Sequence, residues 1–196
     1  MQNLAKVLGL LLVAICLSFT ATDKKTVIID VGHGGHDPGN VTSGFLEKDI
    51  VLGIANKIKE LSEDENIEII LTRSTDESVS LKDRTNLINS LDADLMISLH
   101  INAHRDNSKS GLEVFVSDGN KKAKESSELA EKIKSSFSTD FAYTEVKKAN
   151  FAVLRNSNCP AVLVEMGFLT NQSDRDLLSS EAGQEKVAEI ILEALR

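Results

Sequence analysis

The sequence predicts an α/β protein with a single domain, in which a mostly parallel, mixed sheet is flanked by helices on both faces. Short runs of β-branched and apolar residues alternate with longer segments of helical periodicity. No repeat, low-complexity tract or Pro/Gly/Ser-rich linker interrupts the 196-residue chain. Its 41% hydrophobic and 27% charged residues are ordinary for a globular protein, which excludes a wholly disordered chain or a multi-span membrane protein.

The first half of the chain supplies three predicted strands and two predicted helices. Residues 26–31 (TVIIDV) form a β-branched run that stops at glycine-rich sequence, and 67–72 (IEIILT) is a second such run. Between them, residues 47–61 carry apolar side chains at the spacing of an amphipathic helix. Residues 81–91 are the next predicted helix, and 95–99 (LMISL) form a buried strand.

The second half continues the alternation. Residues 112–116 (LEVFV) and 161–164 (AVLV) are predicted strands. Residues 121–137 form a helix with apolar side chains along one side, and 185–195 form a closing amphipathic helix. Strands separated by helices of this length favour a largely parallel sheet.

Residues 1–21 differ from the rest of the chain and read as a signal peptide. Lys6 is their only charged residue, and the apolar stretch 7–19 is 13 residues long. A membrane-spanning helix needs about 20 residues, so this length fits the core of a secretory signal peptide. We expect cleavage near Ala21, export of residues 22–196 to the periplasm or the exterior, and no membrane span afterwards. An uncleaved amphiphilic anchor is the alternative.

The formal net charge of −8 makes nucleic acid an unsuitable partner, because an acidic chain repels the phosphate backbone. Removal of residues 1–21 would leave Cys159 as the single cysteine, so an exported chain could form no internal disulfide. The apolar core must then supply the stability.

Four polar residues stand where predicted strands end or a helix begins. His33 comes two residues after the first strand, His100 directly follows LMISL, and Glu165 directly follows AVLV. Glu47 opens the helix after the first strand's loop. Ligands of open α/β sheets bind beyond the carboxyl ends of the strands, and none of these four residues belongs to an apolar face.

Two imidazoles and a carboxylate are a ligand set of catalytic zinc, which leaves one position for water. A second carboxylate could take the water's proton and pass it to a leaving nitrogen. The residues alone leave an alternative open, in which one histidine is structural and the other exposed. Glu47 would then be a carboxylate that the dipole of its helix favours.

Seven blocks follow one another along the chain, and the match that they define extends over nearly all of residues 22–196. They are IIDVGHGGHDPGN (28–40), EKD (47–49), LTR (71–73), LKDR (81–84), ADLMISLHINAH (93–104), GLEVFV (111–116) and FAVLR with PAVLVEMGFLTN (151–171). In this order they resemble the type 3 family of zinc-dependent N-acetylmuramoyl-L-alanine amidases.

The resemblance implies that His33, Glu47 and His100 bind one Zn²⁺ per chain and that Glu165 is the catalytic carboxylate. It implies that the domain 22–196 hydrolyses the amide bond between N-acetylmuramic acid and L-alanine in peptidoglycan, in the periplasm or the cell wall. A zinc peptidase acting within the stem peptide is one alternative. A non-catalytic peptidoglycan-binding module is the other, and the presence of all four residues disfavours it.

Other polar residues have less defined roles. His36 and His104 repeat zinc-finger-like spacings, but residues four apart on an extended chain lie about 13 Å apart, so we expect neither to bind the metal. Asp30 could accept a hydrogen bond from a metal-bound imidazole or cap the glycine-rich loop. Asn102 could support the site or contact the substrate.

Arg73 and Arg84 recur in the family pattern, and we expect both to form structural ion pairs rather than substrate contacts. Relatives often carry an arginine shortly before the V-K-x-A-x-F-x-V-L-R segment. This chain has Thr144 and Glu145 there, which leaves the substrate contacts on that side open.

Some members of this family carry an inserted helix that blocks the zinc cleft until an activator protein removes it. The corresponding interval here is 118–150, and its helix 121–137 is needed to cover the sheet. The 13 residues 138–150 can hardly supply a blocking helix and two connections of about 2–6 residues each. We therefore expect an open cleft and no obligatory activator protein. We also expect the protein to be a monomer.

Overall fold

The computed structural model describes residues 24–63, 66–138 and 144–196. Its strands are β1 (Lys25–Val31), β2 (Val41–Thr42), β3 (Phe45–Leu46), β4 (Ile67–Leu71), β5 (Leu95–Asn102), β6 (Leu112–Val116), β7 (Thr144–Lys148) and β8 (Ala161–Phe168). Six of them form one sheet in the order β4-β1-β5-β8-β6-β7, and β2 and β3 form a separate hairpin. The β8–β6 pair is antiparallel and the other pairs of the large sheet are parallel, so the sheet is mixed as predicted.

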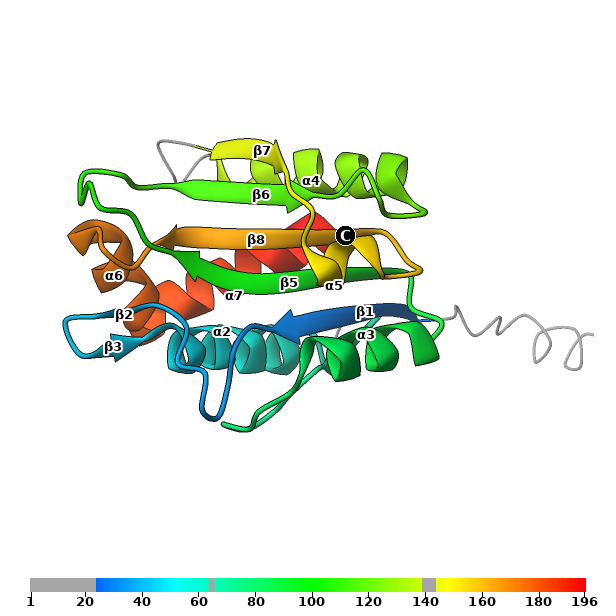
Figure 1. Ribbon diagram of the computed structural model, residues 1–196, viewed down its shortest axis with the longest axis horizontal. Helices are drawn as coiled ribbons and strands as arrows, with labels where there is room; N and C mark the ends of the chain where they lie inside the picture. The colour runs from blue at the N-terminus through cyan, green and yellow to red at the C-terminus, as the bar shows by residue number, and fades with distance from the viewer. Residues whose placement is uncertain (1–23, 64–65, 139–143) are drawn as a thin grey trace, which may run out of the picture.

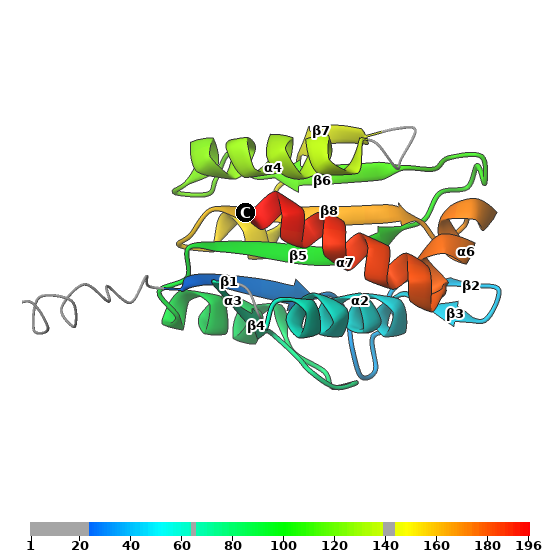
Figure 2. The ribbon, with the colours of Figure 1, turned by 180° about the vertical axis from the view of Figure 1, so that it is seen from behind.

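Helices cover both faces of this sheet (Figures 1 and 2). They are α2 (Glu47–Leu61), α3 (Leu81–Ser90), α4 (Ala123–Phe137), α5 (Ala152–Arg155), α6 (Gln172–Ser179) and α7 (Glu181–Leu195). Helices α2, α7 and α4 lie side by side on one face, which Figure 2 shows from in front. Helices α3 and α5 lie on the other face, over the half of the sheet where β1, β5 and β8 begin (Figure 1). The fold class expected from the sequence is confirmed.

Two apolar clusters fill the space between the sheet and these helices. The larger one lies under α2, α4 and α7 and includes Val27, Ile29, Ile97 and Val164. The smaller one lies under α3 and α5 and includes Ile28. Successive strand residues point to opposite faces, so both faces of the strands are apolar at their amino-terminal ends.

Each strand and helix expected from the sequence is present, and two strands are longer than expected. Strand β5 runs to Asn102 and β8 to Phe168, so His100 and Glu165 lie within strands rather than after them. The two residues are partners in the parallel β5–β8 ladder, and this continued pairing extends both strands. The hairpin, β7, α5 and α6 were not expected. Strand β7 (TEVKK) lies at the edge of the sheet and carries the charged side chains that an edge tolerates.

The predicted signal peptide, residues 1–21, lies outside the described residues. Within the described ranges, none of the helices has the length and hydropathy that a membrane crossing requires.

Candidate active site

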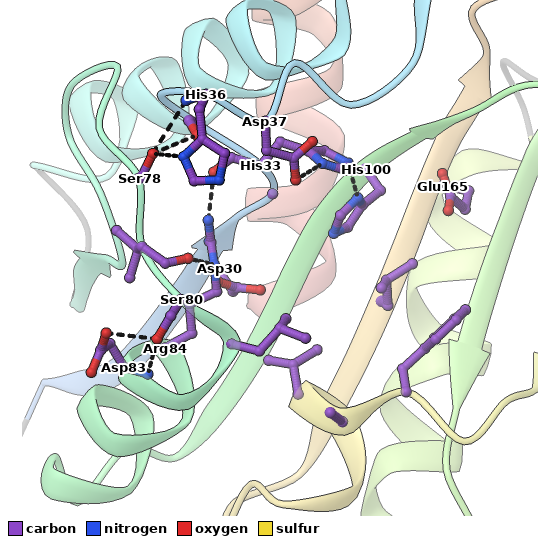
Figure 3. Close-up of a pocket in the computed structure, with 18 residues that line it drawn as sticks. Asp30, His33, His36, Asp37, Ser78, Ser80, Asp83, Arg84, His100 and Glu165 are labelled. Atoms are coloured by element: carbon purple, nitrogen blue, oxygen red, sulfur yellow. Dashed lines mark hydrogen bonds and ion pairs between the residues drawn. The ribbon is translucent and has the colours of Figure 1, made fainter.

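The three predicted metal ligands lie together where β1 and β5 end. His33 stands in the loop after β1, Glu47 is the first residue of α2, and His100 is on β5. Glu47 Oε1 lies 3.0 Å from His33 Nε2 and 3.0 Å from His100 Nδ1, and these two nitrogens are 3.1 Å apart. The two imidazole rings stand edge to face beside the cleft (Figure 3).

The three ligand atoms form a nearly equilateral triangle that fits a metal ion. A tetrahedral zinc ion with bonds of about 2.0–2.1 Å separates its ligand atoms by about 3.3 Å, close to the spacing here. Two imidazoles and one carboxylate are ligands that zinc prefers, and three protein ligands leave a fourth position for water or substrate. In the ranges that the structure describes, no other group of three His, Cys, Asp or Glu residues gathers in this way.

The Glu47 side chain is 1% exposed, and two backbone N–H groups hold its carboxylate in place. Its Oε1 accepts a hydrogen bond from the Ile101 backbone N–H at 2.9 Å, and its Oε2 accepts one from the Asn40 N–H at 2.8 Å. Burial raises the pKa of Glu47, but hydrogen bonds with His100 and His33 outweigh it and hold that pKa well below its usual range. The carboxylate is therefore ionised and aimed at the two imidazoles.

Asp37 orients the His33 ring, a role that the sequence suggested for Asp30. His33 Nδ1 lies 2.8 Å from Asp37 Oδ2, which leaves Nε2 for the metal. Burial lowers the pKa of His33, but hydrogen bonds to Glu47 and Asp37 outweigh it and raise the pKa to about 9. Asp30 instead accepts hydrogen bonds from three side chains, those of Thr72, Arg84 and Ser98.

Asp37 was missed because its position depends on a tight turn. The Gly34 and Asp37 backbones exchange two hydrogen bonds, of 3.0 and 3.2 Å, which bring the Asp37 carboxylate beside the ring four residues earlier. The sequence did contain one signal for this contact, because Asp37 follows His33 by four residues in the same glycine-rich loop.

Glu165 stands across from His100 on the neighbouring strand β8 and faces the same cleft (Figure 3). Its Oε2 is buried, and within the described part of the chain it has no hydrogen-bond partner. Burial raises the pKa of Glu165 to about 7, with Glu47 and Glu113 adding to the shift and His100 opposing it. A carboxylate with a raised pKa beside a metal ligand set can accept a proton and later donate it.

A cleft of about 610 Å³ adjoins these residues and runs between α3 and α5. His33, His100 and Glu165 line one part of it, and His36 lies at its rim. Apolar side chains line another part, among them Val79, Leu81, Phe151 and Leu163, and the polar side chains of Ser78, Ser80, Asp83 and Arg84 also contribute. The cleft therefore offers both polar and apolar contacts to a substrate whose reacting bond lies beside the imidazoles.

His36 and His104 lie outside the ligand group. His36 Nδ1 is 2.7 Å from Ser78 Oγ, and His104 Nδ1 accepts a hydrogen bond from the Asp106 N–H at 3.0 Å. Asn102 supports a neighbouring carboxylate, because its side-chain amide donates to Glu113 Oε2 at 3.0 Å.

The two arginines are structural, as expected, but only one of them forms the expected ion pair. Arg84 pairs with Asp30 at 2.8 Å. Arg73 instead donates hydrogen bonds to four backbone carbonyls. Cys159 is a free, buried thiol in the smaller apolar cluster.

A model of the N-acetylmuramoyl-L-alanine amidase family matches residues 27–196. This chain belongs to the type 3 N-acetylmuramoyl-L-alanine amidase family. The family and the enzyme class expected from the sequence blocks are thereby confirmed. Among its relatives, the N-acetylmuramoyl-L-alanine amidase LytC of Bacillus subtilis (strain 168) is 36% identical over 169 residues, which are 85% of this chain and 34% of LytC.

Solved amidase structures have the same fold. The N-acetylmuramoyl-L-alanine amidase from Clostridium difficile 630 superposes with a TM-score of 0.81 at 38% identity, over 89% of this chain and 96% of that one. The CwlD amidase from Clostridioides difficile, in complex with the GerS lipoprotein, superposes with a TM-score of 0.80 at 32% identity, over 87% of this chain and 96% of that one. This chain thus spans nearly all of each solved amidase chain and about a third of LytC.

Proposed function

We propose that this amidase is a zinc-dependent hydrolase that cleaves the amide bond between the lactyl group of N-acetylmuramic acid and the first L-alanine of the stem peptide in peptidoglycan. The observation that carries the proposal is the triangle of His33, Glu47 and His100 beside the buried carboxylate of Glu165. Family membership supports the substrate class, because the relatives are named for this reaction.

His33, Glu47 and His100 would hold the ion, which supplies a Lewis acid for the amide carbonyl and lowers the pKa of a water molecule. Glu165 takes a proton from the attacking water as its oxygen bonds to the carbonyl carbon. The same carboxyl group then gives that proton to the alanine nitrogen as the C–N bond breaks. The products are a free lactyl carboxylate and a stem peptide with a new amino terminus.

Export fits this substrate, since peptidoglycan lies outside the cytoplasm. Residues 1–21 would act as a signal peptide, and residues 22–196 would work as a monomeric catalytic domain in the periplasm or the cell wall.

We further propose that the mature domain needs no activator protein. Helix α4 packs on the sheet as the crossover helix, and the only element described between α4 and α5 is the edge strand β7. CwlD, a similar chain, was solved in complex with the GerS lipoprotein, so the need for a partner protein has to be tested directly.

Mass analysis of the products from purified peptidoglycan tests the proposed function. The purified protein alone should release intact stem peptides that begin with L-alanine, and Glu165→Gln should release them at least about 10²-fold more slowly. Shorter peptide fragments would identify a peptidase, and binding without any product would identify a binding module. Product formation only after an envelope partner protein is added would contradict the activator-free proposal and leave the reaction itself unchanged.

A further inference from the structure

The loop that carries His33 has an unfavourable backbone conformation. His33 has a φ of +59°, in the left-handed region that residues other than glycine rarely adopt. A residue stays in such a conformation only when surrounding contacts hold it there. The position of the His33 imidazole therefore depends on groups that fix its backbone.

Two buried arginines bind the backbone at this point. Arg73 is 2% exposed and Arg84 is 4% exposed. Between them they donate hydrogen bonds to three successive carbonyls at the end of β1: both to Val31, Arg73 to Gly32 and Arg84 to His33. A guanidinium presents several donors in a rigid plane, so each side chain can bind more than one carbonyl at once.

The same arginines connect His33 to the elements that carry the other two ligands. Arg73 Nη2 donates to the Gly32 carbonyl at 2.8 Å and to the Lys48 carbonyl at 2.8 Å, so it binds the residue next to His33 and the residue next to Glu47. It thereby ties the loop after β1 to the first turn of α2.

Arg84 makes the connection toward His100. Its Nη1 pairs with Asp30 Oδ1 at 2.8 Å, and Asp30 Oδ2 accepts a hydrogen bond from Ser98 Oγ at 2.7 Å. Ser98 lies two residues before His100 on the same face of β5. Figure 3 shows Arg84 and Asp30 below His33, on the wall of the cleft.

We propose that Arg73 and Arg84 are positioning residues that set the metal affinity of the site by holding the three ligand-bearing segments at a fixed spacing. This inference rests on the proposed metal site. Neither arginine belongs to the group of ligand atoms, so neither would touch the ion. Their contribution is to fix the ligand atoms before the metal arrives, so that binding costs little reordering of the loop.

The test measures metal affinity instead of turnover. Arg73→Lys and Arg84→Lys keep the positive charge and lose the planar fork of donors. Arg175→Lys is the matched control, because Arg175 donates to the Leu169 carbonyl at 2.9 Å from α6 and does not line the cleft. The zinc dissociation constant is measured by competition with a chromophoric chelator, and the visible spectrum of the Co²⁺ form reports the ligand geometry.

We expect each of the two variants to raise the zinc dissociation constant about 10–100-fold, as loss of groups that orient metal ligands does. Their Co²⁺ spectra should change, and the control should match the wild type in both measurements. Wild-type affinity and spectrum in both variants would overturn the proposal. Unfolding of both variants in the absence of metal would also overturn it, since the arginines would then be required for folding rather than for positioning the ligands. A wild-type protein that binds neither ion would overturn the proposed metal site itself.

Discussion

The two faces of the central sheet differ where β1, β5 and β8 end, although the same strands form both. On the face under α2, α4 and α7, the side chains are apolar along the whole length of the strands. On the face under α3 and α5, they are apolar where the strands begin and polar where they end. The polar ones are Asp30, Ser98, His100 and Glu165.

This difference shows how one sheet can provide both stability and a reactive site. Helices α2, α4 and α7 close the first face as a single layer, and its residues form one large cluster. Helices α3 and α5 cover only part of the second face, and the uncovered part forms the wall of the cleft. The comparison implies that substitutions on the open face should affect chemistry and those on the closed face should affect folding.

The largest expected effect comes from Glu165→Gln on the open face. The variant keeps the size of the side chain and removes the base, so turnover should fall about 10²–10⁴-fold. Zinc content should stay near that of the wild type, as measured by metal analysis of the purified protein. Glu68→Gln, an exposed carboxylate on the edge strand β4, is the control and should keep its activity. Loss of zinc from a folded Glu165→Gln variant would show that Glu165 is a ligand and that the assigned roles are wrong.

A smaller effect of a different kind is expected from Ile97→Ala on the closed face. Ile97 is fully buried in the larger cluster, and its truncation should lower the free energy of unfolding by about 2–5 kcal/mol. The zinc dissociation constant of the folded variant should not change. Denaturant unfolding and chelator competition measure the two quantities. Val41→Ala, at a side chain that is 57% exposed, should stay within about 0.5 kcal/mol of the wild type. Weakened zinc binding in folded Ile97→Ala would mean that the two faces are not independent.

The smallest effect is expected from the two histidines outside the ligand group. His36→Ala and His104→Ala should each retain one zinc per chain, since neither ring lies in the triangle of ligand atoms. Metal analysis after dialysis checks this, with His100→Ala as the positive control for zinc loss. Loss of zinc from either folded variant would mean that the substituted histidine is a metal ligand and that the assigned ligand set is wrong.

The sequence predicted the four central residues because each is a polar side chain that stands just after a predicted strand or where a helix begins. His100 and Glu165 are such positions, and the matching blocks then assigned their roles. Asp37 was not predicted, because its place depends on a turn that positive backbone angles at Gly34 and Gly35 produce. The carbonyl contacts of Arg73 were missed for a related reason, since the sequence of a loop does not show where its carbonyls point.

Edge elements were also beyond prediction. The charged sequence of β7 has none of the apolar alternation that marks a strand, and pairing with β6 alone keeps it in the sheet. The two-residue strands of the hairpin are too short for any periodicity to appear.

The most direct test of the central claim is a crystal structure of the zinc-saturated protein, with diffraction data collected on both sides of the zinc absorption edge. We expect one strong anomalous peak per chain, at about 2.0–2.2 Å from His33 Nε2, a Glu47 carboxylate oxygen and His100 Nδ1. Glu165 should lie near the peak without bonding to it. A peak at other residues, or no peak at this triangle in zinc-saturated crystals, would contradict the account.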